Sequence, residues 1–200
     1  MKNLFLLTIL GLLALKSQAQ VDAQLNIVNF MLFEASGSVE KAINNRVSIG
    51  GFAGYYYGLP EDNSDILPVF NGNGGENKYF YVGPEIKFYV LPKDKIDRFY
   101  IGAYARYLGG KATSPDTEEY INGNYVPIEV SSTYNKVAFG FSIGSKWVLP
   151  SNIMFGVHGG LDRNIVSIYE NNDYLDHTLG GDDNENFGYR IGISLGYRFN

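Results

Sequence analysis

The chain of 200 residues contains no cysteine. This absence excludes a lipoprotein anchor, a disulfide framework, cysteine catalysis and thiolate metal sites. Beyond the first twenty residues the sequence also lacks any apolar run that approaches eighteen residues, so it offers no transmembrane helix. A mature chain that crosses a membrane must therefore do so as a closed β-barrel, in which all backbone groups pair between strands.

The first nineteen residues have the pattern of a secretory signal peptide. Lys2 gives the start a positive charge, Leu4–Leu15 is apolar, and Ser17 and Ala19 are small residues at the positions that a signal peptidase reads. The apolar run is too short to span a bilayer, which disfavours a membrane anchor. We therefore predict a cleaved signal peptide over residues 1–19 and a single mature domain over residues 20–200.

The mature chain is acidic. Removal of residues 1–19 takes away two lysines and no acid, which leaves 14 basic and 21 acidic residues and a formal net charge of −7. The sequence shows no cluster of lysine or arginine that would offset this balance. Nucleic acid is therefore not expected as a partner.

Residues 187–199 alternate without an error between two kinds of side chain. The odd positions from Phe187 to Phe199 are aromatic or aliphatic, whereas glycine, serine and arginine occupy the even positions. This period of two is typical of a β-strand with one apolar face. Similar segments recur along the chain, and the strands expected from them are Ala23–Phe33, Gly37–Ala42, Arg46–Tyr57, Lys78–Val90, Phe99–Leu108, Tyr134–Leu149, Ile153–Ile168 and Phe187–Phe199.

The connections between these strands alternate in length. Long polar segments follow the third, fifth and seventh strands, at residues 59–77, around Pro115–Pro127 and around Gly180–Glu185. With the N-terminus in the periplasm all three long loops lie on the extracellular side, as in outer-membrane barrels. The sequence therefore predicts an all-β fold, an eight-stranded antiparallel up-and-down transmembrane β-barrel, embedded in the lipid of a bacterial outer membrane.

The glycines indicate which face of the strands points inward. In a soluble, lipocalin-like barrel the apolar face would lie inside. In this chain, small residues such as Gly140, Ser142 and Gly144 alternate with Phe139 and Phe141. Glycine on a solvated strand face has no packing reason, whereas inside a narrow barrel small residues make room for large neighbours. We therefore expect the small and polar face in the lumen and the aromatic face in lipid.

This facing places a set of charged side chains in the lumen. Buried charges persist only when they are paired, so we expect an ionic network with tyrosine hydroxyls in which Glu85 pairs with Arg106 or Arg190. The network is a packed polar plug or, alternatively, a narrow ion path, and the small circumference of eight strands favours the plug. The expected members are Glu40, Glu85, Lys87, Arg106, Lys146, Asp162 and Arg190.

The first strand is the least regular. Asn29 falls on the same face as Ile27 and Met31 if the segment is extended throughout. A β-bulge near Asn29–Phe30 would explain this break in the alternation.

Candidate catalytic and metal-binding residues are few. His158 is expected in the lumen as a satisfied polar side chain, and His177 in the last long loop lacks a placed nucleophile. The acidic run Asp182–Glu185 lacks the spacing of a calcium-binding loop. We expect no catalytic residue, metal or cofactor. A lipid-modifying enzyme that uses His158 or His177 stays open as an alternative.

Three segments resemble small outer-membrane β-barrel proteins of diderm bacteria, of the eight-stranded type of outer membrane proteins A and X. They are Tyr81–Tyr89, Ala138–Pro150 and Tyr189–Phe199. The resemblance implies that the barrel assembly machinery reads a C-terminal aromatic signal, here Tyr197 and Phe199, although Asn200 follows them.

From the barrel architecture we expect a structural or surface-interaction role, with three long acidic loops as the place for an extracellular ligand. Lipid A deacylases of this barrel size carry a histidine and a serine two residues apart on the barrel wall. In this chain Gly160 stands two residues after His158, so that motif is absent.

Overall fold

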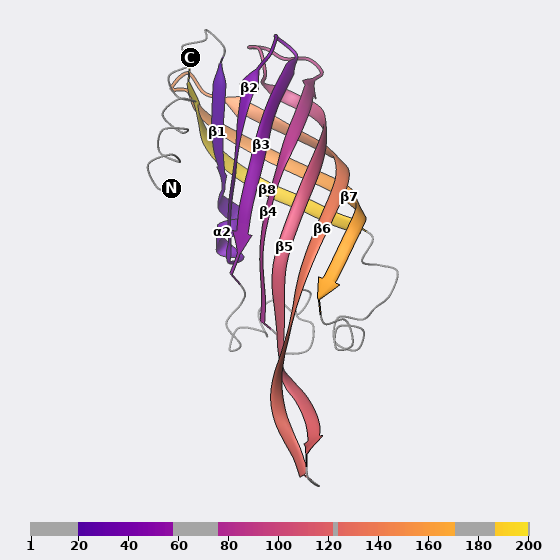
Figure 1. Ribbon diagram of the computed structural model, residues 1–200. Coiled ribbons are helices and arrows are strands. Elements are labelled where there is room, and N and C mark those ends of the chain that lie inside the picture. Colours follow the sequence, from indigo (N-terminus) through magenta and orange to yellow (C-terminus); the bar gives the residue numbers. More distant parts are fainter. Residues whose placement is uncertain (1–19, 58–75, 122–123, 171–186, 200) are drawn as a thin grey trace, which may run out of the picture.

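The computed structural model describes residues 20–57, 76–121, 124–170 and 187–199, and they form a closed antiparallel barrel (Figure 1). Each strand pairs with its sequence neighbours, and β1 pairs with β8 to close the barrel. The predicted eight-stranded up-and-down fold is thus confirmed. The elements are β1 (Val21–Asn26), α2 (Ile27–Met31), β2 (Glu34–Ala42), β3 (Val47–Tyr56), β4 (Glu76–Tyr89), β5 (Arg98–Ile121), β6 (Asn124–Val148), β7 (Ile153–Glu170) and β8 (Phe187–Phe199).

The predicted signal peptide, residues 1–19, lies outside the described residues. In the described part of the chain, no helix is long and apolar enough to cross a bilayer.

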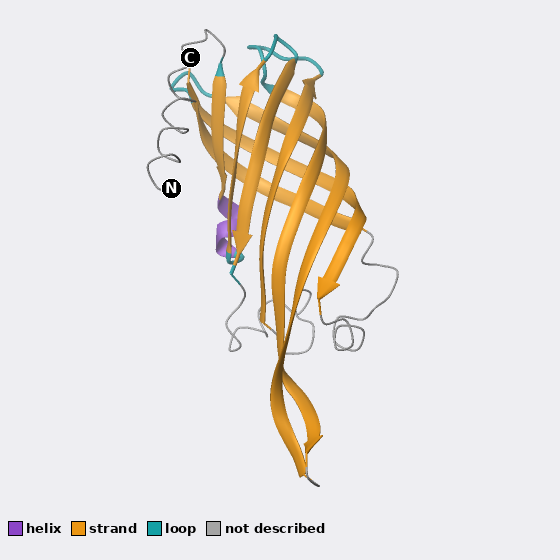
Figure 2. Ribbon diagram, viewed as in Figure 1, coloured by secondary structure: helices purple, strands orange, loops and turns teal. Residues whose placement is uncertain are grey.

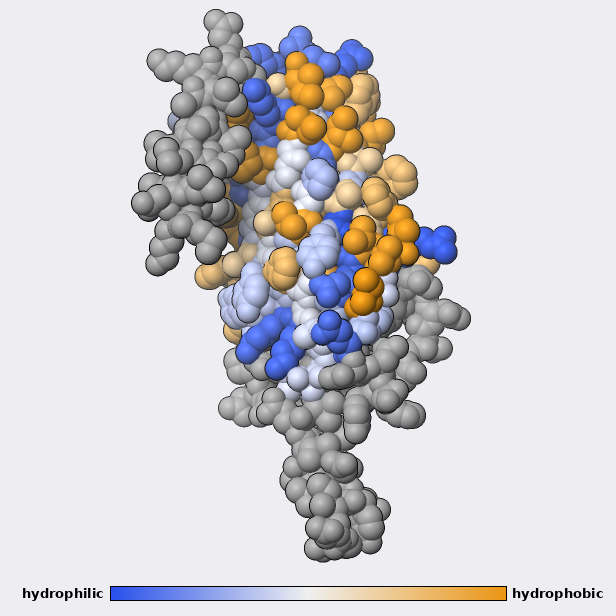
Figure 3. Space-filling view, in the orientation of Figure 1, coloured by the Kyte–Doolittle hydropathy of each residue, from blue (hydrophilic) through white to orange (hydrophobic). Residues whose placement is uncertain are grey.

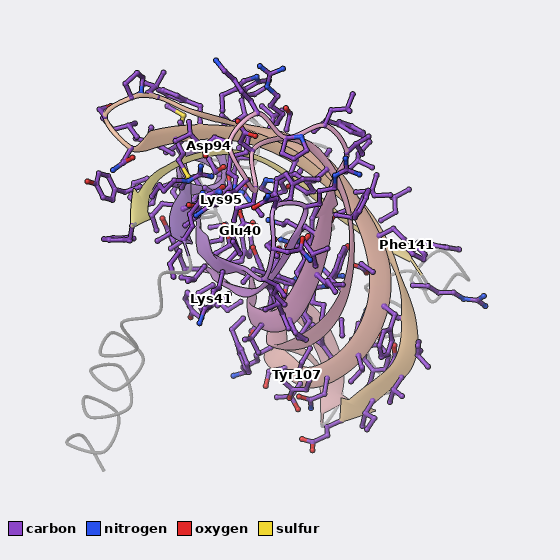
Figure 4. The ribbon with its side chains drawn as sticks, turned by 90° about the horizontal axis from the view of Figure 1, so that it is seen from above. Glu40, Lys41, Asp94, Lys95, Tyr107 and Phe141 are labelled. Carbon is purple, nitrogen blue, oxygen red and sulfur yellow. The ribbon has the colours of Figure 1, made fainter. Side chains whose placement is uncertain are left out.

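Side chains alternate between the lumen and the outer surface along the barrel strands, apart from an irregularity on β7 where Ile165 and Val166 are both exposed. On β6, Phe139 and Phe141 are exposed while Ala138 and Ser142 are buried. Viewed along the barrel, Glu40 lies within the ring of strands and Phe141 points away from it (Figure 4). Apolar residues gather over the upper and middle part of the face formed by β2–β5, with hydrophilic residues above and below (Figure 3). This exterior is that of a barrel whose wall faces lipid.

Glycines on the inner face make room for tyrosines of the adjacent strand. Gly144 pairs with Tyr100 and Gly140 pairs with Tyr104 across β5 and β6. A Cβ at Gly144 would lie 2.5 Å from the Tyr100 hydroxyl, and a Cβ at Gly140 would lie 2.7 Å from the Tyr104 ring. Both distances are far below van der Waals contact, so the large inward side chains require glycine opposite them.

The predicted first strand, Ala23–Phe33, is wrong in its second half. β1 ends at Asn26, and residues 27–31 form the short helix α2 instead of a bulged strand. Phe33 then has a positive φ of 61°, and β2 begins at Glu34, three residues before the predicted start. The irregular alternation has a helical cause, because Ile27, Phe30 and Met31 are spaced at i, i+3 and i+4 and share one face of a helix.

The second predicted long loop is also wrong in part. β5 continues to Ile121 and β6 begins at Asn124, so that the two strands extend past the barrel as a long hairpin (Figure 1). Pairing is continuous apart from a register shift between Ser114 and Thr117. The sequence between the paired ends is Asn122-Gly123, the dipeptide most favoured in two-residue hairpins.

The other connections are short at the end of the barrel where β1 begins and β8 ends, called here the terminal end (Figure 2). The Asn44 side chain accepts backbone N–H bonds from Arg46 and Val47, and Asp97 accepts from Lys93 and Asp94. These side chains stabilise the short turns between β2 and β3 and between β4 and β5. The opposite end is called here the distal end. The predicted loops at 59–77 and 180–185 lie mostly or wholly outside the described residues.

We predict that Ile193→Arg strongly impairs folding of the barrel into micelles. Ile193 is exposed on the outer face near the middle of β8, and a lipid-facing arginine at mid-membrane costs about 2–4 kcal/mol. The folded fraction is measured by heat-modifiable migration on gels and by urea titration.

Ile153→Arg is the matched control, because Ile153 is the first residue of β7 beside a turn at the terminal end. An arginine near the interface costs about 0–1 kcal/mol. Equal folding of the Ile193 variant and the parent would mean that the facing is inverted.

Candidate functional site: the barrel lumen

Five charged side chains form a buried cluster in the terminal half of the lumen. Lys146 lies at its centre, where Nζ donates to Asp22 Oδ2 at 2.5 Å and to the Glu40 carboxylate. Arg198 binds the same aspartate through Nε to Oδ1 at 2.9 Å and Nη2 to Oδ2 at 3.0 Å. Lys87 Nζ lies 3.3 Å from Glu40 Oε2. We call these residues the terminal cluster: Asp22, Glu40, Lys87, Lys146 and Arg198.

Neutral groups complete the terminal cluster and close it toward the terminal end. Tyr89 and Ser48 donate hydroxyl hydrogen bonds to Glu40 at 2.9–3.0 Å. The β4–β5 turn places Ile96 over the cluster, where its side chain is fully buried and its carbonyl accepts from Arg198 Nη2 at 3.0 Å. Asp22 has two cations as partners and Glu40 has two cations and two hydroxyls, so the charges are compensated in spite of their burial.

A second group of contacts occupies the middle of the lumen. Arg106 Nη2 donates to Asp162 Oδ1 at 2.7 Å, and the Tyr104 hydroxyl donates to Asp162 Oδ2 at 2.8 Å. Glu85 accepts a hydrogen bond from the Ser142 hydroxyl at 2.6 Å and lies 3.7 Å from Lys87 Nζ. Lys87 therefore connects this group to the terminal cluster.

Arg190 is held more by aromatic rings than by acids. Its guanidinium carbon lies 3.6 Å from the centre of the Phe52 ring and 4.8 Å from that of Tyr104. Glu85 Oε2 is 4.0 Å from Arg190 Nη1, which is too long for a hydrogen bond. The planar guanidinium is thus fixed in orientation while part of its donor capacity is unused.

All seven side chains predicted for the lumen point into it, from β2 (Glu40), β4 (Glu85 and Lys87), β5 (Arg106), β6 (Lys146), β7 (Asp162) and β8 (Arg190). Arg106 pairs with Asp162 and not with Glu85, whose arginine neighbour is Arg190. Asp22 is missing from the prediction because the predicted first strand begins one residue later, although Asp22, Gln24 and Asn26 continue the polar phase of that strand.

The distal half of the lumen contains a cavity of about 650 Å³. Aromatic side chains of β4–β6 form much of its wall, among them Tyr79, Tyr81 and Tyr134. Lys87 and Tyr100 line it as well. Lys87 forms an ion pair with Glu40, and the Tyr100 ring packs against the Tyr89 ring. A volume of this size is within the range of small-molecule sites in proteins.

Helix α2 is attached to the rim of this cavity through one carboxylate. Asn29 Nδ2 donates to Glu34 Oε1 at 2.6 Å, and the Tyr81 hydroxyl donates to the same oxygen at 2.6 Å. The carboxylate thus connects α2 with β2 and β4. Glu34 is not among the predicted lumen residues, since the predicted second strand begins only at Gly37.

His158 lines the cavity from β7, as expected for a lumen-facing position, whereas His177 lies outside the described residues. Among the residues that the structure describes, no three histidine, aspartate or glutamate side chains are grouped so that they could hold a metal ion.

No protein-family model matches the chain, and no curated protein is similar to it in sequence. Among solved structures the chain is similar to a major outer membrane protein from Thermus thermophilus, with a TM-score of 0.50 and 13% identity over 90% of this chain and 98% of that chain. At this identity the similarity shows the fold alone. The chain has the fold of a bacterial outer-membrane β-barrel protein.

Two further solved structures are more distant. Acinetobacter baumannii CarO has a TM-score of 0.48 and 11% identity over 90% of this chain and 97% of that chain. Neisserial surface protein A has a TM-score of 0.43 and 12% identity over 90% of this chain and 94% of that chain.

We predict that Lys146→Met destabilises the barrel by about 3–5 kcal/mol, because it leaves two buried carboxylates short of a cation. Urea unfolding of the protein in detergent micelles measures the change. Lys41→Met is the matched control. Lys41 is the second-to-last residue of β2 and lies on the outer side of the ring of strands (Figure 4). A loss for Lys146→Met no greater than that for Lys41→Met would contradict the importance of the terminal cluster.

Proposed function

We propose that this protein is an integral protein of a bacterial outer membrane that binds a ligand at its distal, cell-surface end and neither conducts ions nor catalyses a reaction. The single observation that carries the proposal is the difference between the two halves of the lumen. The terminal half is filled by the terminal cluster, whereas the distal half contains the cavity.

The filled terminal half argues against a channel. Asp22, Lys146 and Arg198 are each no more than 1% exposed, and Ile96 and Tyr89 are fully buried beside them. An ion path through this region would have to separate pairs that compensate each other in a low-dielectric environment. An eight-stranded barrel also has little internal width beyond that taken by its own side chains.

The distal half argues for binding rather than catalysis. The cavity has a large aromatic wall and a few charged side chains, which is the usual composition of a small-molecule site. His158 is its acid–base candidate, and Gly160 stands where the deacylase motif has serine.

On the outer face of β8, Tyr197 and Phe199 remain our candidates for the signal that the barrel assembly machinery reads. Their rings are 5.0 Å apart.

We predict that the purified protein produces no unitary conductance steps in planar lipid bilayers. The closed terminal half leaves no continuous water path for ions. A general porin inserted into the same bilayers serves as the positive control. Reproducible steps that depend on the presence of this protein would favour the narrow channel instead.

We also predict that lipid A is unchanged by expression of the protein. Mass spectrometry compares lipid A from cells that express the parent, His158→Ala or His177→Ala with lipid A from cells that lack the protein. A modification that appears with the parent and disappears with either variant would favour a lipid-modifying enzyme.

A further inference from the structure

The barrel wall is interrupted on one side of the distal half. β1 pairs with β8 only over Val21–Asn26 and Ser194–Phe199, so Phe187–Ile193 pairs with β7 alone. Likewise, residues 34–36 of β2 pair with β3 alone, because β1 reaches only Gly37. Helix α2 lies in the position that the rest of β1 would occupy (Figure 1). We call this interruption the lateral seam.

Helix α2 separates lipid from the lumen at the lateral seam. Its residues Ile27, Phe30 and Met31 are exposed, whereas Val28 and Asn29 line the cavity. A helix of five residues pairs only part of its backbone internally, and α2 adds no strand ladder to β8 or β2. Its polar attachment is the Asn29–Glu34 hydrogen bond, so the wall is held here by side-chain contacts rather than by a strand ladder.

The cavity reaches the outer surface at this seam. On β3–β7 the residues that line it are inward-facing, as Tyr81 and His158 illustrate. At the seam the lining also includes outward-facing residues, namely Leu25 of β1 and Phe187, Tyr189 and Ile191 of β8. Leu25 is 69% and Ile191 70% exposed, more than the neighbouring Ile193 at 44%. The cavity therefore opens sideways between apolar, lipid-facing side chains.

Unused hydrogen-bonding capacity is concentrated around the same cavity. Within residues 20–57, 76–121, 124–170 and 187–199, four buried side-chain atoms lack a hydrogen-bond partner: Asn26 Oδ1, Ser36 Oγ, Arg106 Nε and Arg190 Nη1. All four belong to residues that line the cavity. Buried polar groups are rarely left without partners, and unpaired ones are costly. Two of the four are guanidinium nitrogens, which favour an anionic acceptor.

The unpaired donors around the cavity favour an anionic head group on the ligand. Arg106 has Asp162 as its carboxylate partner and Arg190 lies 4.0 Å from Glu85, yet each keeps a guanidinium nitrogen without an acceptor. A carboxylate would accept from these nitrogens, and its geometry matches a guanidinium group better than it matches a lysine.

We propose that the cavity binds a single-chain amphiphile with a carboxylate head, such as a long-chain fatty acid. The head lies at Arg190 and Arg106, and the alkyl chain leaves through the lateral seam along α2 and the distal half of β8. The inference rests on the proposed binding function and names the class of ligand for it.

The test uses the whole protein in lipid nanodiscs and a palmitate analogue with a diazirine near the end of its chain. After irradiation, peptide mass spectrometry locates the labelled residues. We expect labels on α2 and on β8 near Ile191, and we expect palmitate to compete for the site whereas hexadecanol, which has the same chain without a charge, competes at least tenfold less well. Labels distributed over the outward residues of all strands, or equal competition by the alcohol, would overturn the proposal.

Arg190→Gln tests the head-group site. It keeps hydrogen-bond donors but removes the charge, and we expect at least a tenfold loss of labelling at α2 and β8. Arg163→Gln is the matched control, because Arg163 is an exposed arginine of β7, which pairs with β8, the strand of Arg190. Equal labelling of the two variants would refute the role of Arg190. If palmitate does not bind and conductance is also absent, the inference about the class of ligand is refuted. The proposed function is then judged by the bilayer and lipid A measurements alone.

Discussion

The rest of the barrel depends on the ionic bonds of the terminal cluster. Lys146 on β6 binds Asp22 on β1 and Glu40 on β2, which lie across the lumen from it in the strand order. Arg198 on β8 binds Asp22 as well and so connects the last strand with the first. Backbone ladders join only adjacent strands, whereas Lys146 joins strands on opposite sides of the lumen. Removing one partner leaves an uncompensated charge, and the cluster therefore acts as one unit.

This unit also explains why the lumen has two different halves. At the terminal end the acids and cations are matched closely enough to be fully buried. Farther along the lumen, Arg106 has Asp162 as a partner, while Arg190 lies against aromatic rings at 4.0 Å from its nearest acid. The compensation of charge thus becomes less complete toward the cavity. A gradient of this kind seals one end and leaves the other able to accept an anion.

The sequence predicts the parts of this structure that depend on local periodicity. Strict alternation in β8 and β6 identifies strands, and the small residues that alternate with phenylalanines in β6 identify the inner face. The ion pairs could not be assigned in this way, because the partner of Arg106 depends on the stagger of strands around the whole barrel. The β5–β6 hairpin could have been expected from Asn122-Gly123, but the polar residues and two prolines around it are also typical of a loop.

Residues 27–31 show how a change of period alters the wall of a barrel. In an extended strand Ile27, Asn29 and Met31 would share one face, which would expose an amide to lipid. In a helix Ile27, Phe30 and Met31 share the outer face and Asn29 turns inward to Glu34. The helical alternative thus buries the polar group and keeps apolar residues in lipid, but it removes the strand that would have sealed β8. Without that strand, Phe187–Ile193 of β8 and residues 34–36 of β2 each have one paired neighbour instead of two. The lateral seam at α2 is therefore the direct consequence of the change of period.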